Sequence, residues 1–131
     1  MTTTLDHLQR LIALPTVSCD SNLALINYAQ DHLEARGFAV HRVMDASGQK
    51  AGLFARLGPD DKPGVMLSGH SDVVPVEGQA WTSDAFTVRR DGARVYGRGT
   101  TDMKGFLAAM LALADRAQGL TLAEPLKFAI S

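Results

Sequence analysis

The sequence predicts an α/β fold, a three-layer α/β/α sandwich whose sheet is mixed but largely parallel. Segments with helical spacing of apolar residues alternate along the chain with short runs typical of strands. Between Tyr96 and Gly105 the pattern changes from strand to helix, as at the end of a β-strand that leads into a helix. The 131 residues contain no internal repeat and no linker-like tract, and correspond to about one domain.

Three segments are predicted to be helices. Their apolar residues recur at helical spacing, in residues 5–12, 25–33 and 103–114. Thr3 or Thr4 can cap the first helix, and Asp20 or Ser21 can cap the second. Gly37 follows the second helix, where a residue without a Cβ is favoured.

The predicted strands are short apolar-rich runs, at residues 38–43, 52–57, 65–67 and 126–130. A hairpin is predicted at residues 86–96, with its turn at Asp91-Gly92. Because residues 65–67 are apolar without interruption, we expect them to form a central strand that is buried on both faces. We expect residues 126–131 to lie at an exposed edge of the sheet, which would favour pairing with another chain.

The composition is that of a soluble globular protein, with 46% hydrophobic and 21% charged residues. The net charge of −1 argues against binding to nucleic acid or to anionic membranes. Residues 106–114 form the most apolar run and are far too short to span a bilayer. The first residues lack the features of a signal peptide, and the single cysteine, Cys19, cannot form an internal disulfide. These features predict a cytoplasmic protein.

A histidine and an aspartate follow the strand predicted at residues 65–67. His70 and Asp72 are two positions apart, so in an extended chain their side chains lie on the same side. Open α/β sheets bind ligands at the carboxyl ends of their strands. One imidazole nitrogen of His70 could bind a metal ion while Asp72 fixes the tautomer through the other nitrogen. The pattern predicts a metal ligand at His70 and an orienting carboxylate at Asp72.

A second acidic residue, Asp102, ends the turn that precedes the helix predicted at residues 103–114. Gly97 and Gly99 allow this turn to be sharp. The exposed N–H groups and the dipole at the start of a helix favour a carboxylate there. Because the turn leads from a strand into a helix, Asp102 could converge with His70, and its two oxygens could bridge two cations about 3.5–4 Å apart.

Each of these residues also has a purely structural explanation. Taken alone, His70 could be a hydrogen-bonded loop histidine, Asp102 an ordinary helix N-cap and Asp72 a turn residue. The other histidines are predicted to lie on helix or strand surfaces without a role: His7, His32 and His41.

Other site motifs are incomplete in this sequence. The segment Gly69-His70-Ser71-Asp72-Val73 lacks the last glycine of the G-x-S-x-G nucleophile elbow, which argues against a serine hydrolase. Asp102 stands where a dinucleotide-binding fingerprint has its third glycine, and a carboxylate there would repel a pyrophosphate. The Gly-Lys-Ser/Thr of a P-loop does not occur.

Together, the two motifs resemble the metal-binding core of the M20 metallopeptidase family. Residues 68–106 contain its HxD and GRG-x-x-DMKG patterns, in SGHSDVVPVEGQAWTSDAFTVRRDGARVYGRGTTDMKGF. Residues 1–66 also fit the start of that fold. The WTSDAF segment is more similar to the acetylornithine deacetylase branch than to the succinyl-diaminopimelate desuccinylase branch. The chain departs from the family at Ser71, Ala85 and Thr101, where Thr, Pro and Cys or Ala are usual.

The resemblance implies a site with two divalent metal ions, zinc or possibly cobalt. In that site His70 would be a ligand of one ion, Asp102 would bridge both, and Asp72 would orient and polarise His70 during catalysis. A cis peptide bond between Asp102 and Met103 is also implied. The implied reaction is hydrolysis of the amide of an N-acyl amino acid, such as N-acetylornithine to ornithine and acetate in arginine biosynthesis. Succinyl-diaminopimelate desuccinylase is the alternative within the family.

Members of this family are much longer than 131 residues. The resemblance identifies residues 1–131 as the amino-terminal part of a metallohydrolase catalytic domain. It implies that a Glu-Glu pair, a further acidic ligand, a final His ligand and an inserted domain that forms homodimers lie outside this sequence. We therefore expect weak metal binding and no turnover from this chain alone, since catalytic zinc usually has three protein ligands. The other function class is a non-catalytic binding or assembly domain that keeps the fold.

Overall fold

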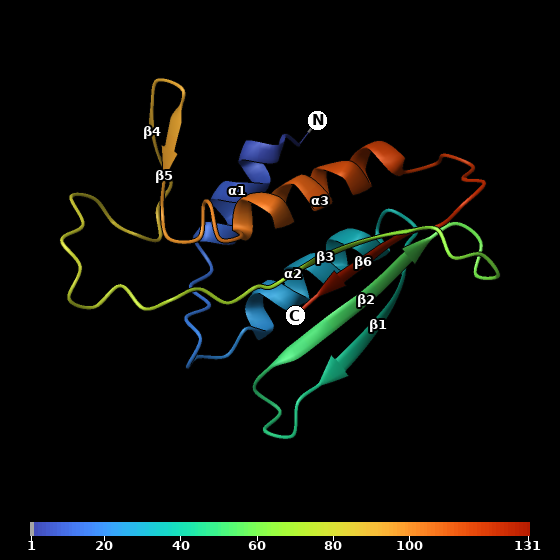
Figure 1. Cartoon of the computed structure of the whole chain (residues 1–131), viewed down its shortest axis with the longest axis horizontal. Helices are drawn as coiled ribbons and strands as arrows, with labels where there is room; N and C mark the ends of the chain where they lie inside the picture. The colour runs from blue at the N-terminus through green and yellow to red at the C-terminus, as the bar shows by residue number, and fades with distance from the viewer. Residues whose placement is uncertain (1) are drawn as a thin grey trace.

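A computed structural model describes residues 2–131 as a twisted sheet with helices packed against it (Figure 1). The helices are α1 (Thr4–Ile12), α2 (Leu23–Glu34) and α3 (Lys104–Ala117). The main sheet contains β1 (Ala39–Met44), β2 (Ala51–Leu57), β3 (Val65–Gly69) and β6 (Leu126–Ile130). A separate hairpin contains β4 (Arg89–Asp91) and β5 (Arg94–Tyr96), which confirms the hairpin predicted around Asp91-Gly92.

The strands of the main sheet are ordered β1-β2-β6-β3. Only β3 and β6 run parallel; the β1–β2 and β2–β6 pairs are antiparallel. The α/β class and the mixed sheet are therefore confirmed, whereas the sequence predicts mostly parallel pairing. For β1 and β2 the difference arises because the turn at residues 45–50 is too short for a parallel crossover, which needs a dozen or more residues.

The positions of two strands differ from the sequence prediction. β6 lies between β2 and β3, pairing Leu53 with Ile130 on one side and Leu67 with Phe128 on the other. The prediction of an exposed edge at residues 126–131 is therefore wrong for β6. Within residues 2–131, β3 is an edge strand and not a central one, and Val65 is 61% exposed because no neighbouring element covers it.

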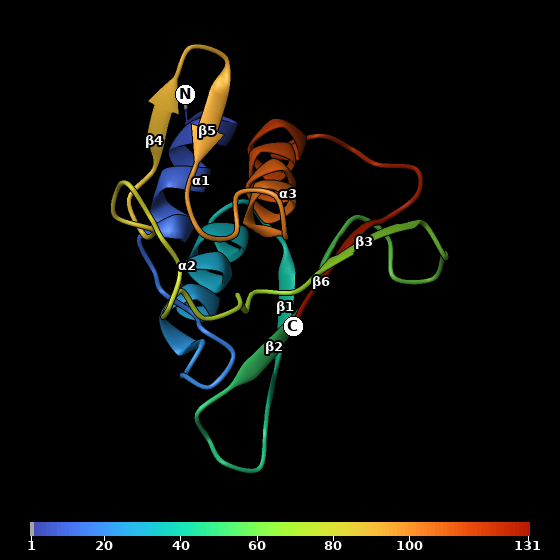
Figure 2. The same cartoon turned by 60° about the vertical axis from the view of Figure 1, so that its left-hand side comes forward.

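All three helices lie on the same side of the main sheet, as Figure 2 shows in the turned view. Helix α2 packs against β1 and β2, α3 packs against β3, and α1 packs mainly against α3. On the opposite face, Val43, Phe54 and Met66 are exposed. Residues 2–131 thus form two layers, and they do not supply the second helical layer of the predicted three-layer sandwich.

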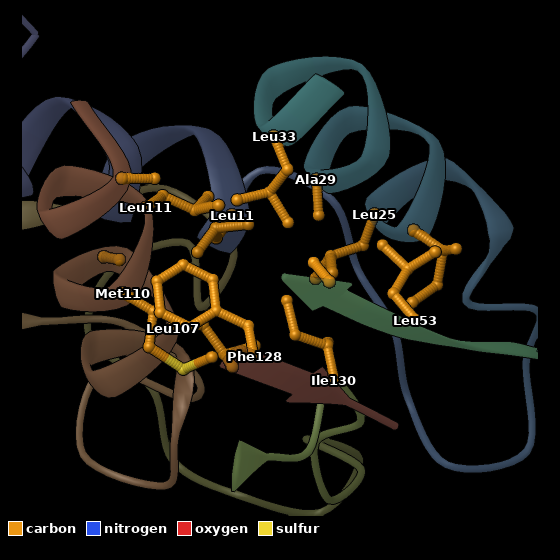
Figure 3. Packing of buried hydrophobic residues seen from close by; sticks show 14 of the residues in the cluster. Leu11, Leu25, Ala29, Leu33, Leu53, Leu107, Met110, Leu111, Phe128 and Ile130 are labelled. Atoms are coloured by element: carbon orange, nitrogen blue, oxygen red, sulfur yellow. The ribbon is translucent and has the colours of Figure 1, made fainter. Parts of the chain in front are cut away.

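The core lies between the helices and the covered face of the sheet (Figure 3). Alternate residues of β2 and β6 point toward the helices, among them Leu53, Phe128 and Ile130. The rings of Phe38 and Phe128 stack with their centroids 5.2 Å apart. Apolar residues from all three helices complete the core, including Leu11, Leu25, Leu33, Leu107, Met110 and Leu111.

The helix ends agree with the sequence prediction in part. Thr3 is the N-cap of α1, and it forms a capping box with Asp6. Asn22 occupies the N-cap position of α2, where Asp20 or Ser21 is predicted, and the hydroxyl of Ser21 accepts a hydrogen bond from the N–H of Leu23. None of the helices in residues 2–131 has the length and hydropathy needed to cross a membrane.

Two histidines that the sequence places on the surface are buried. His7 in α1 and His32 in α2 lie within the helical layer, where both approach Asp115 of α3. The surface prediction is wrong for them because their ring nitrogens point into the contact between the helices, toward Asp115. Helical spacing alone does not show which residue of another helix lies opposite. His41 in β1 is exposed, as predicted.

Candidate metal site

The segment that follows β3 is held between two other parts of the chain. The N–H of Ser71 donates to the carbonyl oxygen of Ser131, so the pairing of β3 with β6 extends past the strand end. On the other side, the N–H of Val73 donates to the carbonyl oxygen of Thr16 at 2.9 Å. Asn22 hydrogen-bonds both to the buried hydroxyl of Ser71 and to the backbone of Ala51. These contacts fix the backbone on both sides of His70 and Asp72.

The turn before α3 approaches this segment closely. Gly99 has φ +89°, and a Cβ on it would lie 2.7 Å from a methyl group of Val73. The N–H of Lys104 donates to the carbonyl oxygen of Gly99 at 2.7 Å, and the peptide bond between Asp102 and Met103 is cis. The cis bond implied by the family resemblance is therefore present. The N-cap of α3 is Met103, with no side-chain cap, so Asp102 is not an ordinary N-cap.

The structure brings the three predicted site residues together. Nε2 of His70 lies 2.9 Å from Oδ1 of Asp102, and Nδ1 of His70 lies 3.1 Å from Oδ1 of Asp72. Nδ1 also lies 3.0 Å from the backbone carbonyl oxygen of Asp72. The imidazole is thus placed between two carboxylates, one at each ring nitrogen.

Hydrogen bonds set the electrostatics of this group. A hydrogen bond from the hydroxyl of Ser18 to Oδ2 of Asp72, 2.7 Å long, is the main cause that lowers the pKa of Asp72. Burial acts to lower the pKa of His70, but the hydrogen bond with Asp102 and the interactions with Asp72 outweigh it, so the pKa of His70 is raised. The two carboxylates beside the imidazole favour positive charge at this place, either as a proton on His70 or as a bound cation.

The arrangement fits a metal ion chemically. His70 and Asp102 both line a hollow of about 210 Å³, and the side chain of Asp102 is 82% exposed, so its carboxylate is accessible. Imidazole nitrogen and carboxylate oxygen are ordinary ligands of zinc. If the proton of His70 stays on Nδ1, toward Asp72, the lone pair of Nε2 is available to an ion that replaces the proton shared with Asp102. Metal binding by His70 and Asp102 stays a prediction.

Several supporting residues were missed by the sequence analysis. Ser18 and Asn22 lie far from the motifs along the chain, and a single serine or asparagine carries no sequence signal for such a contact. Lys104 is fully buried, and its Nζ donates to the carbonyl oxygens of Leu11 and Leu14. Burial lowers the pKa of Lys104 to about 8. Its place within the DMKG motif is the one sequence feature that could have pointed to a supporting role for Lys104.

Comparisons with known proteins identify relatives. Residues 66–131 match the family described as Peptidase family M20/M25/M40. Succinyl-diaminopimelate desuccinylase of Erythrobacter litoralis is 40% identical over 119 residues, which are 85% of this chain and 31% of that protein. Acetylornithine deacetylase of Proteus mirabilis is 39% identical over 115 residues, 82% of this chain and 30% of that protein. The chain therefore spans about a third of the length of these relatives.

Solved structures show the same fold. Human carnosine dipeptidase 1 superposes with a TM-score of 0.81 and 28% identity, over 98% of this chain and 31% of that one. An M20 family metallo-carboxypeptidase from Sulfolobus solfataricus superposes with a TM-score of 0.79 and 22% identity, over 100% of this chain and 31% of that one. The α/β fold of these two proteins is thereby confirmed for residues 2–131.

Proposed function

Because the chain belongs to peptidase family M20/M25/M40, we propose that it forms part of a metal-dependent hydrolase of amide bonds. The observation that supports this most strongly is the 2.9 Å approach of His70 Nε2 to Asp102, two residues from separate motifs. A structural loop histidine would not need an accessible carboxylate at its free nitrogen. The approach also argues against the alternative of a non-catalytic binding or assembly domain. In such a domain the side chains of His70 and Asp102 would not be expected to lie together.

We propose a separate role for each of the three residues. His70 would hold one divalent ion, zinc or cobalt, and Asp102 would hold that ion together with a second one. Asp72 holds the proton of His70 on Nδ1 and is itself held by Ser18, which keeps the imidazole in one orientation. Bound metal would polarise the substrate carbonyl and lower the pKa of a water molecule to about 7.

The proposed substrate is an N-acyl amino acid. Acetylornithine deacetylase and succinyl-diaminopimelate desuccinylase relatives match this chain at nearly equal identity, 39% and 40%. The WTSDAF segment favours deacetylation of N-acetylornithine, with ornithine and acetate as products, and desuccinylation is the second candidate. A cytoplasmic location, a role in arginine biosynthesis and dimer formation by a longer form stay predictions.

The described residues supply too few ligands for turnover. His70 and Asp102 give each of two ions at most two protein ligands, whereas catalytic zinc usually has three and an open position. We expect the purified chain to bind zinc weakly and to release no acetate from N-acetylornithine and no succinate from N-succinyl-diaminopimelate. Product release above the rate without protein, lost in an Asp102→Asn variant, would show that the chain has a complete site.

The substrate proposal is tested by binding, since turnover is not expected. Line broadening of the acetyl protons of N-acetylornithine is measured by NMR with the chain present, with and without zinc. We expect broadening that requires zinc and disappears in a His70→Ala variant, and weaker broadening of the succinyl protons of N-succinyl-diaminopimelate. Broadening that is the same without zinc would contradict a metal-dependent site, and stronger broadening of the succinyl compound would favour desuccinylation.

A further inference from the structure

A second cluster of metal-ligating side chains lies inside the helical layer, apart from the candidate metal site. It consists of His7 in α1, His32 in α2 and Asp115 in α3. Nε2 of His7 lies 2.7 Å from Oδ2 of Asp115, and Nε2 of His32 lies 3.1 Å from Oδ1. One ligand atom from each residue lies within 4.8 Å of the other two. Three helices thus direct two imidazoles and one carboxylate to one point.

The two imidazoles are held in different ways. Nδ1 of His7 lies 3.0 Å from the hydroxyl of Tyr28, which orients the ring so that Nε2 faces Asp115. A hydrogen-bond partner at the second ring nitrogen is the usual support of a metal-binding histidine. Nε2 of His32 is buried and has no hydrogen-bond partner within residues 2–131, because its approach to Asp115 lacks hydrogen-bond geometry. Buried polar atoms without a partner are rare and call for an explanation.

We propose that His7, His32 and Asp115 bind a divalent transition-metal ion such as zinc, at a second site of structural type. Two imidazole nitrogens and a carboxylate oxygen are a ligand set that zinc commonly takes. The side chains of His7, His32 and Asp115 are 0%, 8% and 11% exposed, so the ion would be enclosed by the three helices it connects. Asp115 lies about 16 Å along α3 from Lys104, at a rise of 1.5 Å per residue, so this site is distinct from the one at Asp102.

Arg36 also contacts the carboxylate of this cluster. Its Nε lies 2.5 Å from Oδ1 of Asp115, and its guanidinium also donates to the carbonyl oxygen of His32. Arg36 lies just beyond the end of α2 and its side chain is 23% exposed, so it can turn toward solvent when an ion binds Oδ1. Arg36 therefore competes with the ion, as two cations for one carboxylate. Asp115 also borders a hollow of about 410 Å³ beside residues 2–4.

The test uses zinc titration by calorimetry in a His70→Ala background, which removes the other candidate site. We expect one zinc ion per chain to bind in this background. His32→Ala should abolish this binding, and Tyr28→Phe, which removes only the oriented hydroxyl, should weaken it about 10–100-fold. Tyr96→Phe, in the β4–β5 hairpin, is the matched control and should leave it unchanged. Arg36→Met should tighten binding because the competing cation is gone.

A spectroscopic measurement covers the case in which a variant fails to fold. Copper(II) added to the folded His70→Ala protein should give an electron paramagnetic resonance spectrum with hyperfine coupling to two imidazole nitrogens. Absence of zinc binding in the His70→Ala background would overturn the proposal. Binding that His32→Ala leaves unchanged, or that Arg36→Met weakens, would overturn it as well, because the cluster would then be a purely structural ion-pair network.

Discussion

At the residue scale, only some of the side chains that form or support the candidate site can be recognised from the sequence. His70, Asp72 and Asp102 belong to two short motifs, and their position after a strand and before a helix, together with the family resemblance, makes them candidates. Ser18, Asn22 and Lys104 act through contacts with distant backbone, which no local pattern encodes. The burial of His7 and His32 was missed for the same reason, since their partner Asp115 lies on another helix.

Lys104 provides a test at this scale. A lysine in the first turn of a helix is unfavourable for that helix, because its N-terminus carries partial positive charge. Lys104 instead serves α1, since its Nζ binds the carbonyl oxygens of Leu11 and Leu14. Lys104→Met would leave these oxygens without their donor, and we expect the free energy of unfolding to fall by about 1–3 kcal/mol.

Chemical denaturation measures this change, with Lys62→Met as the control, because the hydrogen bond from Lys62 to the carbonyl oxygen of Ala123 is exposed to solvent. The control should change the free energy of unfolding by no more than about 0.5 kcal/mol. Equal effects of the two substitutions would mean that the contacts of Lys104 with α1 do not contribute to stability.

At the element scale, the sequence predicts the three helices and the strands, because apolar spacing and caps are local properties. The order of the strands was not predictable in the same way. The apolar run of β3 suggests a central strand, but β6 takes that position because its alternate residues Phe128 and Ile130 meet the helices. The face on which a strand is buried depends on elements that pack against it from elsewhere in the chain.

A substitution on each face of the sheet tests this arrangement. Phe128 is 0% exposed and stacks on Phe38, whereas Phe54 on the neighbouring strand points to the uncovered face and is 42% exposed. We expect Phe128→Ala to lower the free energy of unfolding by about 3–5 kcal/mol, through lost burial and a cavity. Phe54→Ala should have a much smaller effect, within about 0.5 kcal/mol. Similar losses from both would show that the two faces are equally buried.

The contact between α2 and α3 predicts a dependence of stability on pH in the metal-free protein. Burial, then the charge of Arg36, lowers the pKa of His32 below its usual 6.5, although Asp115 acts in the opposite direction. The unfolded chain therefore binds a proton that the folded His32 does not, and this contribution to stability is lost as the pH falls below about 6.5. The raised pKa of His70 acts in the opposite sense, so the comparison requires a variant.

We expect the free energy of unfolding to depend less steeply on pH in His32→Gln than in the unchanged protein. The difference should appear between about pH 7 and pH 5, where the imidazole of an unfolded histidine titrates. Urea unfolding at several pH values, in the presence of a chelator, measures it. A steeper decrease of stability with acid in the variant would contradict the lowered pKa of His32.

At the scale of the whole molecule, residues 2–131 form an α/β unit with one face of its sheet uncovered. The fold class was predictable from the alternation of helices and strands and from the family motifs. The single helical layer was not, because the number of layers depends on which segments pack on each face. The candidate site lies at the carboxyl end of β3, where the segment after this strand meets residues 16–18 and the turn before α3.

Joint binding of a metal ion by His70 and Asp102 is tested most directly at the imidazole of His70. Its ¹⁵N resonances are followed by NMR during a zinc titration of the chain, of Asp102→Asn, and of Asp91→Asn as a control in the β4–β5 hairpin. We predict that Nε2 shifts to the position of a zinc-bound nitrogen while Nδ1 stays protonated, and that Asp102→Asn, but not Asp91→Asn, weakens this change. His70 resonances that do not move while zinc binds elsewhere on the chain would contradict the account.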